Sequence, residues 1–508
     1  MPKGPPNLSL GQINDIWGQI VGSVTVRLRA SALVAGLVAL TLIGSLAAEA
    51  KNSARPTGGK AVAHRDGKRV SAGPIPVAVT YSLGHHALEP SLGVGPGGDI
   101  FYAAAGFDTP GGALSVTDIM RSEDEGQTWE IVSPRVLDQN TMPVSLDPYV
   151  WVDDRLDGDT SRIYTIDLTV ACSYLAYSDD DGATWTSNPL ACGRPVNDHQ
   201  TLFGGPPASS PTVGYPNVLY YCYNDVASSQ CTKSLDGGIT FHPTGSPAFT
   251  GYKPGSEETG FYGANGFCGG LHGHGTVGDD GTVVLPREYC GEPYLAISHD
   301  EGLTWTNVRV SKIRSISQPD EGAAHPSVAI DGAGNIYYTW IGQKDRVLYL
   351  SVSKDGGENW SKPVVASAPA LTETNLPQID VRGKGKIAIA YYGSVNSKFD
   401  ECARECDGAD YVKTTWNGYI TISADALSSN PTFFTGTMNT PKDPLVRARC
   451  GPGRCKSVFD FIDVEIGPDG IAYAAFVDDC MEGCTELTPN EGDYEGLLSK
   501  LVGGPSLR

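Results

Sequence analysis

The stretch Ser298-His-Asp300-Glu-Gly302-Leu-Thr304-Trp305 decides the fold, because close copies of it recur along the middle of the chain. The shared template is S-x-D-x-G-x-T-W, and five copies start at Ser122, Ser178, Ser234, Ser298 and Ser353. Successive starts lie 56, 56, 64 and 55 residues apart. A repeat of this length is typical of propellers, solenoids and arrays, in which each repeat is one supersecondary unit.

The chemistry of the template is that of a tight turn. Ser and Asp side chains bond nearby backbone N–H groups, and Gly supplies the positive φ that another residue would adopt only with strain. Thr and Trp then begin the next strand, with the indole as an apolar anchor. We therefore expect a structural role for the five aspartates Asp124, Asp180, Asp236, Asp300 and Asp355. The pattern identifies an architecture and does not locate an active site.

Each copy closes a longer unit of four expected strands. In the fifth unit, strands are expected over 325–331, 336–340 and 347–352, and a fourth begins at Trp360. The same order recurs in units that begin near Glu89, Asp147, Asp198 and His272. Four strands and a turn make one propeller blade.

Two further units are less regular. The sixth begins at Asn375 and keeps a degenerate copy at Ser423-Ala-Asp425, whereas the seventh begins at Asp460 and has none. Residues 77–81 are expected to supply its missing outer strand and close the ring. The sequence thus predicts an all-β fold, a single β-propeller of four-stranded antiparallel blades. Seven blades are favoured, and six are the alternative.

These repeats resemble the Asp-box, or BNR-repeat, β-propellers, of which the sialidases are the best-known members. The resemblance covers about residues 80 to 500. It implies exo-acting glycoside hydrolysis of the sialidase type. Because fold does not imply function, a non-catalytic propeller that binds carbohydrate or protein is the alternative. The resemblance further implies a Tyr nucleophile paired with Glu, an Asp acid/base, and three arginines that grip a sialic acid carboxylate.

The family's residue set is incomplete in this chain. The Arg-Ile-Pro signature of the first sialidase blade should fall near Leu88-Glu89-Pro90, where there is no arginine. Arg287, on a second strand of unit four, is similar to the family's second arginine, and Arg447 or Arg449 is a candidate for the third. The catalytic candidates are Glu89, Asp147, Asp198, Arg287 and Tyr289.

Polar residues also gather where the units begin, and these positions should converge on one mouth of the channel. Five of the nine histidines of the chain lie at unit starts. The substrate-binding candidates are Tyr149, His199, His272, His274 and His325. The same side chains have metal-ligand chemistry, or they cap strand ends. The acidic loop 153–159 suggests calcium but lacks EF-hand spacing. No cofactor is required, and calcium is left open.

The N-terminus resembles a targeting segment. Arg27 and Arg29 precede an apolar run over 32–48, and Ala48-Glu-Ala50 is an A-x-A-like cleavage site. We expect an extension with a signal peptide in residues 1–50, a basic flexible linker in 51–75, and the propeller in 76–508. An uncleaved membrane anchor is the alternative to cleavage. The propeller is expected to be secreted, or else anchored to a membrane with the propeller outside.

Charge and cysteine content limit the partners and the compartment. The formal net charge of −21 argues against nucleic acid and anionic membrane surfaces. The expected partner is a carbohydrate or glycoprotein, membrane contact is limited to an uncleaved N-terminal segment, and a monomer is expected. Twelve cysteines in an exported chain indicate disulfides, although sequence does not fix their connectivity. Sequential pairing gives Cys172–Cys192, Cys222–Cys231, Cys268–Cys290, Cys402–Cys406, Cys450–Cys455 and Cys480–Cys484.

Overall fold

The structure is a computed structural model. It describes residues 54–55, 57–106, 116–136, 139–140, 147–154, 156, 161–168, 172–192, 197–225, 228–250, 271–316, 325–397, 414–447, 461–480 and 495–508. The expected signal segment, Arg449, most of the acidic loop and several cysteines lie outside these residues. One compact unit spans Ala50–Arg508. In the part of the chain described, no helix combines the length and apolar character needed to cross a bilayer.

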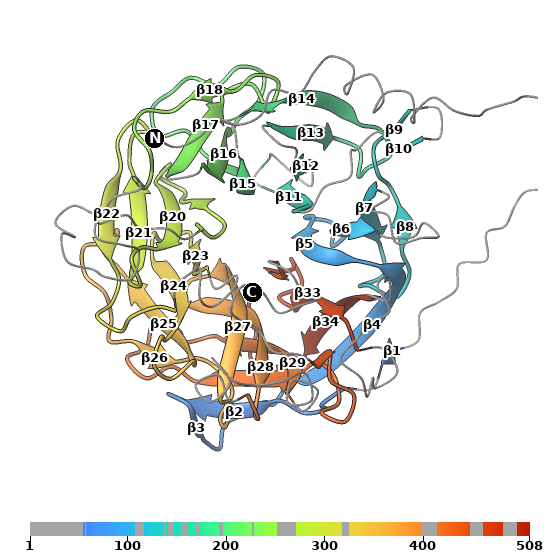
Figure 1. Cartoon of the computed structure of the whole chain (residues 1–508), viewed down its shortest axis with the longest axis vertical. Coiled ribbons are helices and arrows are strands. Elements are labelled where there is room, and N and C mark those ends of the chain that lie inside the picture. Colours follow the sequence, from blue (N-terminus) through green and yellow to red (C-terminus); the bar gives the residue numbers. More distant parts are fainter. Residues whose placement is uncertain are drawn as a thin grey trace, which may run out of the picture. The chain divides into compact units, whose positions relative to one another are not determined.

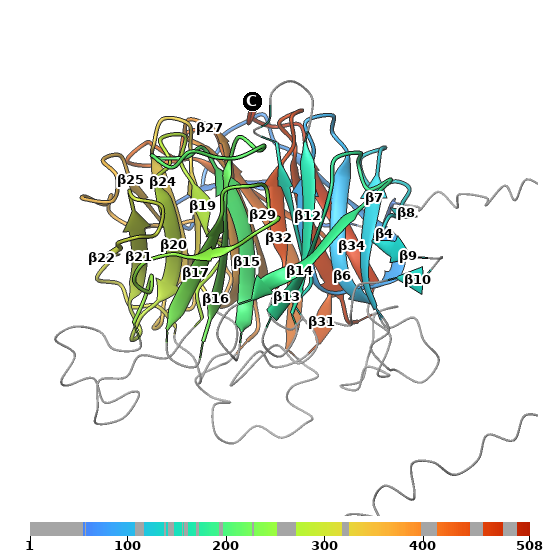
Figure 2. The same cartoon turned by 90° about the horizontal axis from the view of Figure 1, so that it is seen from above.

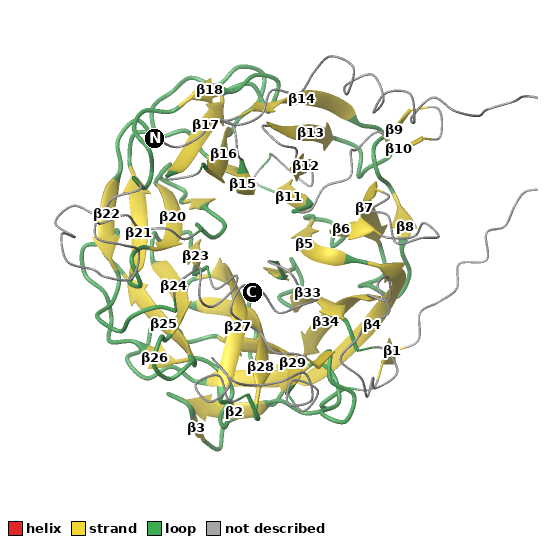
Figure 3. Cartoon of the chain, in the orientation of Figure 1, coloured by secondary structure: helices red, strands yellow, loops and turns green. Residues whose placement is uncertain are grey.

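The expected all-β propeller with four-stranded antiparallel blades is confirmed (Figures 1 and 3). Five regular blades follow one another along the chain, each a meander from the channel outward. The first blade holds β5 (Leu88–Val94), β6 (Ile100–Gly106), β7 (Val116–Ser122) and β8 (Glu130–Ile131). The second holds β11 (Tyr149–Asp153), β12 (Arg162–Leu168), β13 (Cys172–Ser178) and β14 (Thr186–Cys192).

The next three blades repeat this order. The third holds β15 (Asp198–Gly205), β16 (Val218–Asn224), β17 (Ser229–Ser234) and β18 (His242–Pro243). The fourth holds β19 (Thr276–Val277), β20 (Val283–Glu288), β21 (Pro293–Ser298) and β22 (Thr306–Arg309). The fifth holds β23 (Ser327–Ile330), β24 (Ile336–Ile341), β25 (Leu348–Ser353) and β26 (Val364–Val365). A small hairpin, β9 (Arg135–Val136) and β10 (Gln139–Asn140), follows the first blade.

Two larger sheets complete the ring, and both take in strands from near the N-terminus. One holds β27 (Glu373–Gly383), β28 (Lys386–Ser394), β29 (Thr415–Ser423), β30 (Phe433–Thr437), β2 (Val62–Arg65) and β3 (Lys68–Arg69), with β31 (Val446–Arg447) beside β29. The other holds β32 (Asp463–Ile466), β33 (Ala472–Asp478), β34 (Glu495–Val502), β4 (Val77–His86) and β1 (Ala54–Arg55). Figure 2 shows the strands running through the thickness of the ring.

Strand β4 closes the ring, as expected for residues 77–81. It pairs antiparallel with β34, with Leu498 opposite Tyr81 and Leu501 opposite Ala78. The first and last parts of the described chain therefore form one sheet. The ring closes by hydrogen bonds between strands that are more than 400 residues apart.

The range 51–75, expected to be a linker, contains paired strands β1, β2 and β3 in its described residues. Strand β2 pairs with the edge strand β30, and the buried His64 bonds the Thr435 hydroxyl at 2.8 Å. Arg55 on β1 forms an ion pair with Asp478 at 2.6 Å. An edge strand offers unpaired N–H and C=O groups, so pairing outweighs the basic, Gly-containing composition that suggested a linker.

The core lies between blades rather than within one of them. Each pair of adjacent blades shares a cluster of buried apolar residues, such as Leu202 with Tyr164 and Ile389 with Ile341. The inner strands are therefore held by packing on both faces. The predicted Cys222–Cys231 disulfide joins β16 and β17. Cys290 and Cys480 are also disulfide-bonded, while their expected partners Cys268 and Cys484 lie outside the described residues.

The five S-x-D-x-G-x-T-W turns, here called box turns, join the third and fourth strands of the regular blades. In the fourth blade, Gly302 N donates to Ser298 Oγ at 2.8 Å, and Thr304 N donates to Asp300 Oδ1 at 2.9 Å. The Thr304 hydroxyl donates to Asp300 Oδ2 at 2.6 Å. The box glycines have φ between 81° and 94°, as expected. The five aspartates thus hold turns and lie away from the channel.

Candidate functional site

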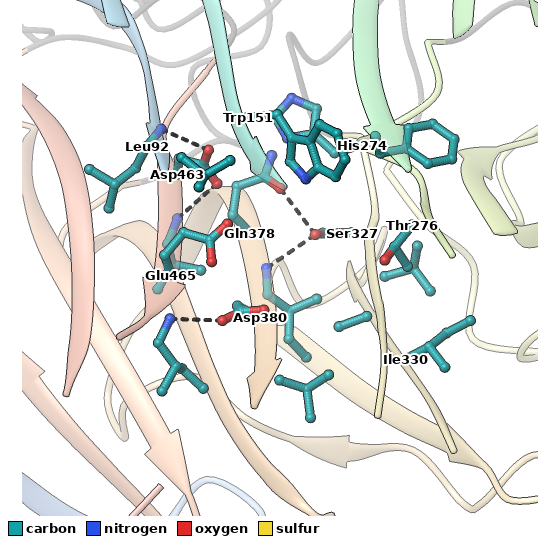
Figure 4. A pocket seen from close by; sticks show the side chains of 18 of the residues that line it. Leu92, Trp151, His274, Thr276, Ser327, Ile330, Gln378, Asp380, Asp463 and Glu465 are labelled. Atoms are coloured by element: carbon teal, nitrogen blue, oxygen red, sulfur yellow. Dashed lines mark hydrogen bonds between the residues drawn. The ribbon is translucent and has the colours of Figure 1, made fainter. Parts of the chain in front are cut away.

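The innermost strands enclose a cavity of about 450 Å³ along the channel (Figure 4). Its lining comes from β5, β11, β15, β23, β27 and β32, and from residues 274–279 around β19. Most of these positions lie beyond the first residues of the inner strands. The cavity is therefore set deeper in the channel than the mouth where the candidate residues were expected to converge.

Glycines allow the inner strands to approach one another at this radius. A Cβ at Gly204 would lie 2.9 Å from the Trp151 indole and 2.8 Å from the Val218 carbonyl oxygen. A Cβ at Gly275 would lie 2.4 Å from the Phe203 ring. Such contacts are too short for any real Cβ, so these positions require glycine for close packing and not for a special φ.

Three carboxyl groups form one wall of the cavity. Asp463 and Glu465 are two residues apart on β32 and share a face, and Asp380 lies on the neighbouring β27. Asp463 accepts hydrogen bonds from Leu92 N at 3.0 Å and Val464 N at 2.9 Å, and Asp380 accepts one from Ile466 N at 2.7 Å. Figure 4 shows the three side chains on the same side of the cavity.

The protein environment makes these carboxyl groups weak acids. Burial raises the pKa of Asp463 to about 7 and the pKa of Asp380 to about 6. Burial, together with the nearby Asp380 and Asp463, raises the pKa of Glu465 well above its usual value. Low dielectric and like charge both disfavour the ionised form. Asp463 and Asp380 therefore take up and release protons near neutral pH.

Aromatic side chains form another wall. Trp151 lines the cavity and stacks on Tyr164, with ring centroids 5.6 Å apart and planes at 21°. Tyr149 meets His274 edge to face at 4.7 Å, and both line the cavity. Trp151 is half-buried, so part of its ring is available to a ligand. Of the predicted substrate-binding residues, Tyr149 and His274 therefore belong to the cavity.

The predicted catalytic residues Glu89 and Asp147 link blades. Glu89 accepts a hydrogen bond from Asp147 N at 2.6 Å, and Asp147 accepts one from His199 N at 3.2 Å. All three have positive φ, at 50°, 68° and 55°, where the inner strands begin. Both carboxylates are buried and neither lines the cavity. Their chemistry is that of acceptors for backbone N–H groups that would otherwise be buried without a partner.

The other three catalytic candidates also lie outside the cavity lining. Arg287 is 2% exposed, donates to Ser229 Oγ at 3.1 Å and sits over the Phe249 ring at 5.6 Å. Tyr289 is in the core between blades, and its hydroxyl donates to Thr250 O at 3.0 Å. Asp198 is half-buried at the start of β15. Packing between the third and fourth blades explains the buried positions of Arg287 and Tyr289.

Histidines do gather at the mouth, as the sequence pattern predicts. His199 contacts His325 at 4.3 Å and His272 at 6.2 Å between ring centroids, and Phe461 packs against His199 at 4.4 Å. Burial lowers the pKa of His272 to about 4 and the pKa of His325 to about 3. These imidazoles are neutral at physiological pH. Within the described residues, no three His, Cys, Asp or Glu side chains are placed to hold one metal ion.

Sequence reasoning missed Asp380 and Glu465 because it concentrated on the first residue of each unit. The sequence nevertheless contains a pattern that marks these two residues. Gln378, Asp380 and Arg382 alternate along one inner strand, and Asp463 and Glu465 along another. Alternation of polar residues on an innermost strand marks one face of that strand, and here this face lines the cavity.

Comparisons with known proteins give structural likeness only. No family model matches the chain, and no curated protein matches it. A Hadza microbial sialidase is 18% identical over 64% of this chain and 68% of its own, with a TM-score of 0.39. A Dyadobacter fermentans protein of unknown function is 14% identical over 88% and 98%, with a TM-score of 0.38. An intramolecular trans-sialidase from Ruminococcus gnavus is 13% identical over 82% and 95%, with a TM-score of 0.37. Likeness at this level identifies no function.

Proposed function

We propose that this protein is an exported carbohydrate-binding propeller whose ligand occupies the channel cavity. The observation that carries the proposal is the pairing of a half-buried indole, Trp151, with hydrogen-bonding carboxyl groups in one cavity of about 450 Å³. A cavity of this size is in the usual range for a small-molecule ligand. Sugars present C–H faces that stack on aromatic rings and hydroxyl groups that donate to carboxylates. The Asp-box resemblance supports the same ligand class.

Binding to an array of oligosaccharides tests this function. The full chain, with its disulfides intact, should bind a subset of sugars, and Trp151→Ala should weaken that binding by about tenfold or more through loss of the stacking surface. Tyr174→Ala is the matched control, because Tyr174 is an exposed aromatic residue on β13 that does not line the cavity. No binding to any sugar, or an equal loss in both variants, would contradict the proposal.

A second candidate function is glycoside hydrolysis, and one observation favours it. Asp463, with its pKa raised to about 7 by burial, is partly protonated at neutral pH and lies near two other carboxyl groups. Glycosidases need a proton donor and a second carboxyl group. Turnover of any member of a fluorogenic glycoside panel, abolished in Asp463→Asn, would establish an enzyme. Binding without turnover would leave the binding propeller.

A further inference from the structure

The charge balance of the cavity is one-sided. Carboxyl groups line it at five positions, namely Asp154, Asp279, Asp380, Asp463 and Glu465. The lining described contains a single guanidinium, that of Arg382. Arg382 is exposed, donates to Ile466 O at 3.0 Å and lies 3.9 Å from Asp154 Oδ2. Its charge acts on Asp154 and also lowers the pKa of Asp380 and Glu465, but burial outweighs this effect and leaves both pKa values raised.

The three inner carboxyl groups face one another across two adjacent strands. The bond from Ile466 N to Asp380 joins β32 to β27, so that Asp380 lies next to the face that carries Asp463 and Glu465. The charges of Asp380 and Asp463 raise the pKa of Glu465, and a bound cation would relieve this repulsion. An anionic sugar would add negative charge to a space in which the carboxyl groups already resist ionisation.

We infer that the carbohydrate bound in this cavity carries a protonated amino group, as in the hexosamine units of a deacetylated polysaccharide. The inference rests on the proposed function and narrows it to one ligand class. The ammonium group has three donors, which match the carboxyl oxygens of Asp380 and Glu465. The sugar ring then stacks on Trp151 at the other wall. An N-acetylated ring of the same shape lacks the charge.

The titratable and charged groups that face the ammonium position come from four inner segments. They are Tyr149 and Asp154, His274 and Asp279, Asp380 and Arg382, and Asp463 and Glu465. Burial lowers the pKa of His274 to about 3, so His274 contributes no charge near neutral pH. Binding a cation favours ionised carboxyl groups and releases protons. For a ligand whose amino group stays protonated throughout, the affinity should therefore weaken as pH falls through the range of about 7 to 6 in which Asp463 and Asp380 take up protons.

Calorimetry with a matched pair of ligands tests the inference. The full chain is titrated with a chitosan tetrasaccharide and with the N-acetylated chitin tetrasaccharide, near neutral pH. We expect the chitosan oligomer to bind about tenfold or more tightly, because hydrogen bonds between charged partners are stronger than those between neutral ones. Glu465→Gln should remove most of this difference. Glu358→Gln, which alters an exposed carboxylate on the fifth-blade turn, should leave it intact.

The outcomes separate the inference from the function on which it rests. Equal binding of the two oligomers, or tighter binding of the acetylated one or of a sialylated sugar, overturns the amino-sugar inference and leaves a carbohydrate-binding propeller. Tight binding of a non-sugar amine such as spermidine, with no binding of either oligomer, overturns the carbohydrate function as well. If Glu465→Gln fails to fold, the wild-type ligand pair and the exposed Asp154→Asn variant still decide the question.

Discussion

At the residue scale, one side-chain chemistry serves three purposes in this ring. Asp300 accepts hydrogen bonds in a partly exposed turn, and although burial raises its pKa, bonds from Thr304 and Ser298 lower it overall. Glu89 accepts a backbone N–H bond across two blades. Asp463 lines a cavity, and burial raises its pKa. The residue type alone therefore does not reveal the role; the burial of each carboxyl group and the donors around it decide it together.

Glu89 provides the prediction at this scale. Glu89→Ala leaves the buried Asp147 N–H without the acceptor that lies 2.6 Å away, and should destabilise the fold by about 1–3 kcal/mol. Glu89→Gln keeps an acceptor oxygen of the same reach and should cost much less. Urea unfolding of the two variants measures this order. A glutamine variant as unstable as the alanine variant would show that the charge, and not the hydrogen bond, holds the blades.

At the scale of elements, the box turn is a closed hydrogen-bonded unit that also packs against a neighbouring blade. A Cβ at Gly302 would lie 2.9 Å from Thr244 Cγ2, and one at Gly126 would lie 2.2 Å from Leu498 Cδ2. The glycine is thus needed twice, for its positive φ and for the close approach of the next blade. In the fifth turn Asn359 replaces Thr, and its side-chain amide donates to Asp355 Oδ2 at 2.8 Å.

Three substitutions in the box turn of the fourth blade should destabilise the fold by amounts that follow a fixed order. Gly302→Ala strains φ and meets Thr244, Asp300→Ala removes the acceptor of two bonds from Thr304, and Thr304→Val removes only the hydroxyl bond. The loss of stability should be largest for Gly302→Ala. It should be about 1–2 kcal/mol for Asp300→Ala and smallest for Thr304→Val. Midpoints of urea denaturation give the ranking. A Thr304→Val loss that matches Asp300→Ala would contradict the role of the backbone bond.

Much of the fold could be predicted at this scale, and less of the site. The box turns and the closing strand at Val77–His86 follow from local patterns that reappear in the structure. The pairing of β2 with β30 could not be foreseen, because it depends on an edge that only the assembled blade presents. Whether the Asp380 side chain faces the channel depends on a register shift between Asn375 and Gln378 in β27. A bulge of this kind changes which alternate residues face the channel, and composition does not show it.

At the scale of the whole molecule, two sets of buried groups titrate in opposite senses. The mouth histidines are neutral and buried, with pKa lowered by burial to about 4 for His272 and about 3 for His325. The cavity acids have pKa raised by burial, to about 7 for Asp463 and about 6 for Asp380. Folding therefore opposes protonation of the histidines and ionisation of the acids. The pH of maximum stability should therefore lie between about 3, where folded His325 takes up a proton, and about 7, where folded Asp463 loses one.

Because the pKa shifts of Asp463 and His325 have opposite directions, substitution of each residue should move the pH of maximum stability in opposite directions. The folded-state pKa of Asp463 lies above its ordinary value of 3.8, so its contribution to stability is present below that value and is lost as pH rises toward about 7. The folded-state pKa of His325 lies below its ordinary value of 6.5, so its contribution is present above 6.5 and is lost as pH falls toward about 3. Asp463→Asn removes the first dependence and should move the pH of maximum stability upward, whereas His325→Gln removes the second and should move it downward. Thermal unfolding of the full chain across acidic to neutral pH measures both shifts. Shifts of the same sign in the two variants would mean that neither group controls the pH dependence in the way its burial requires.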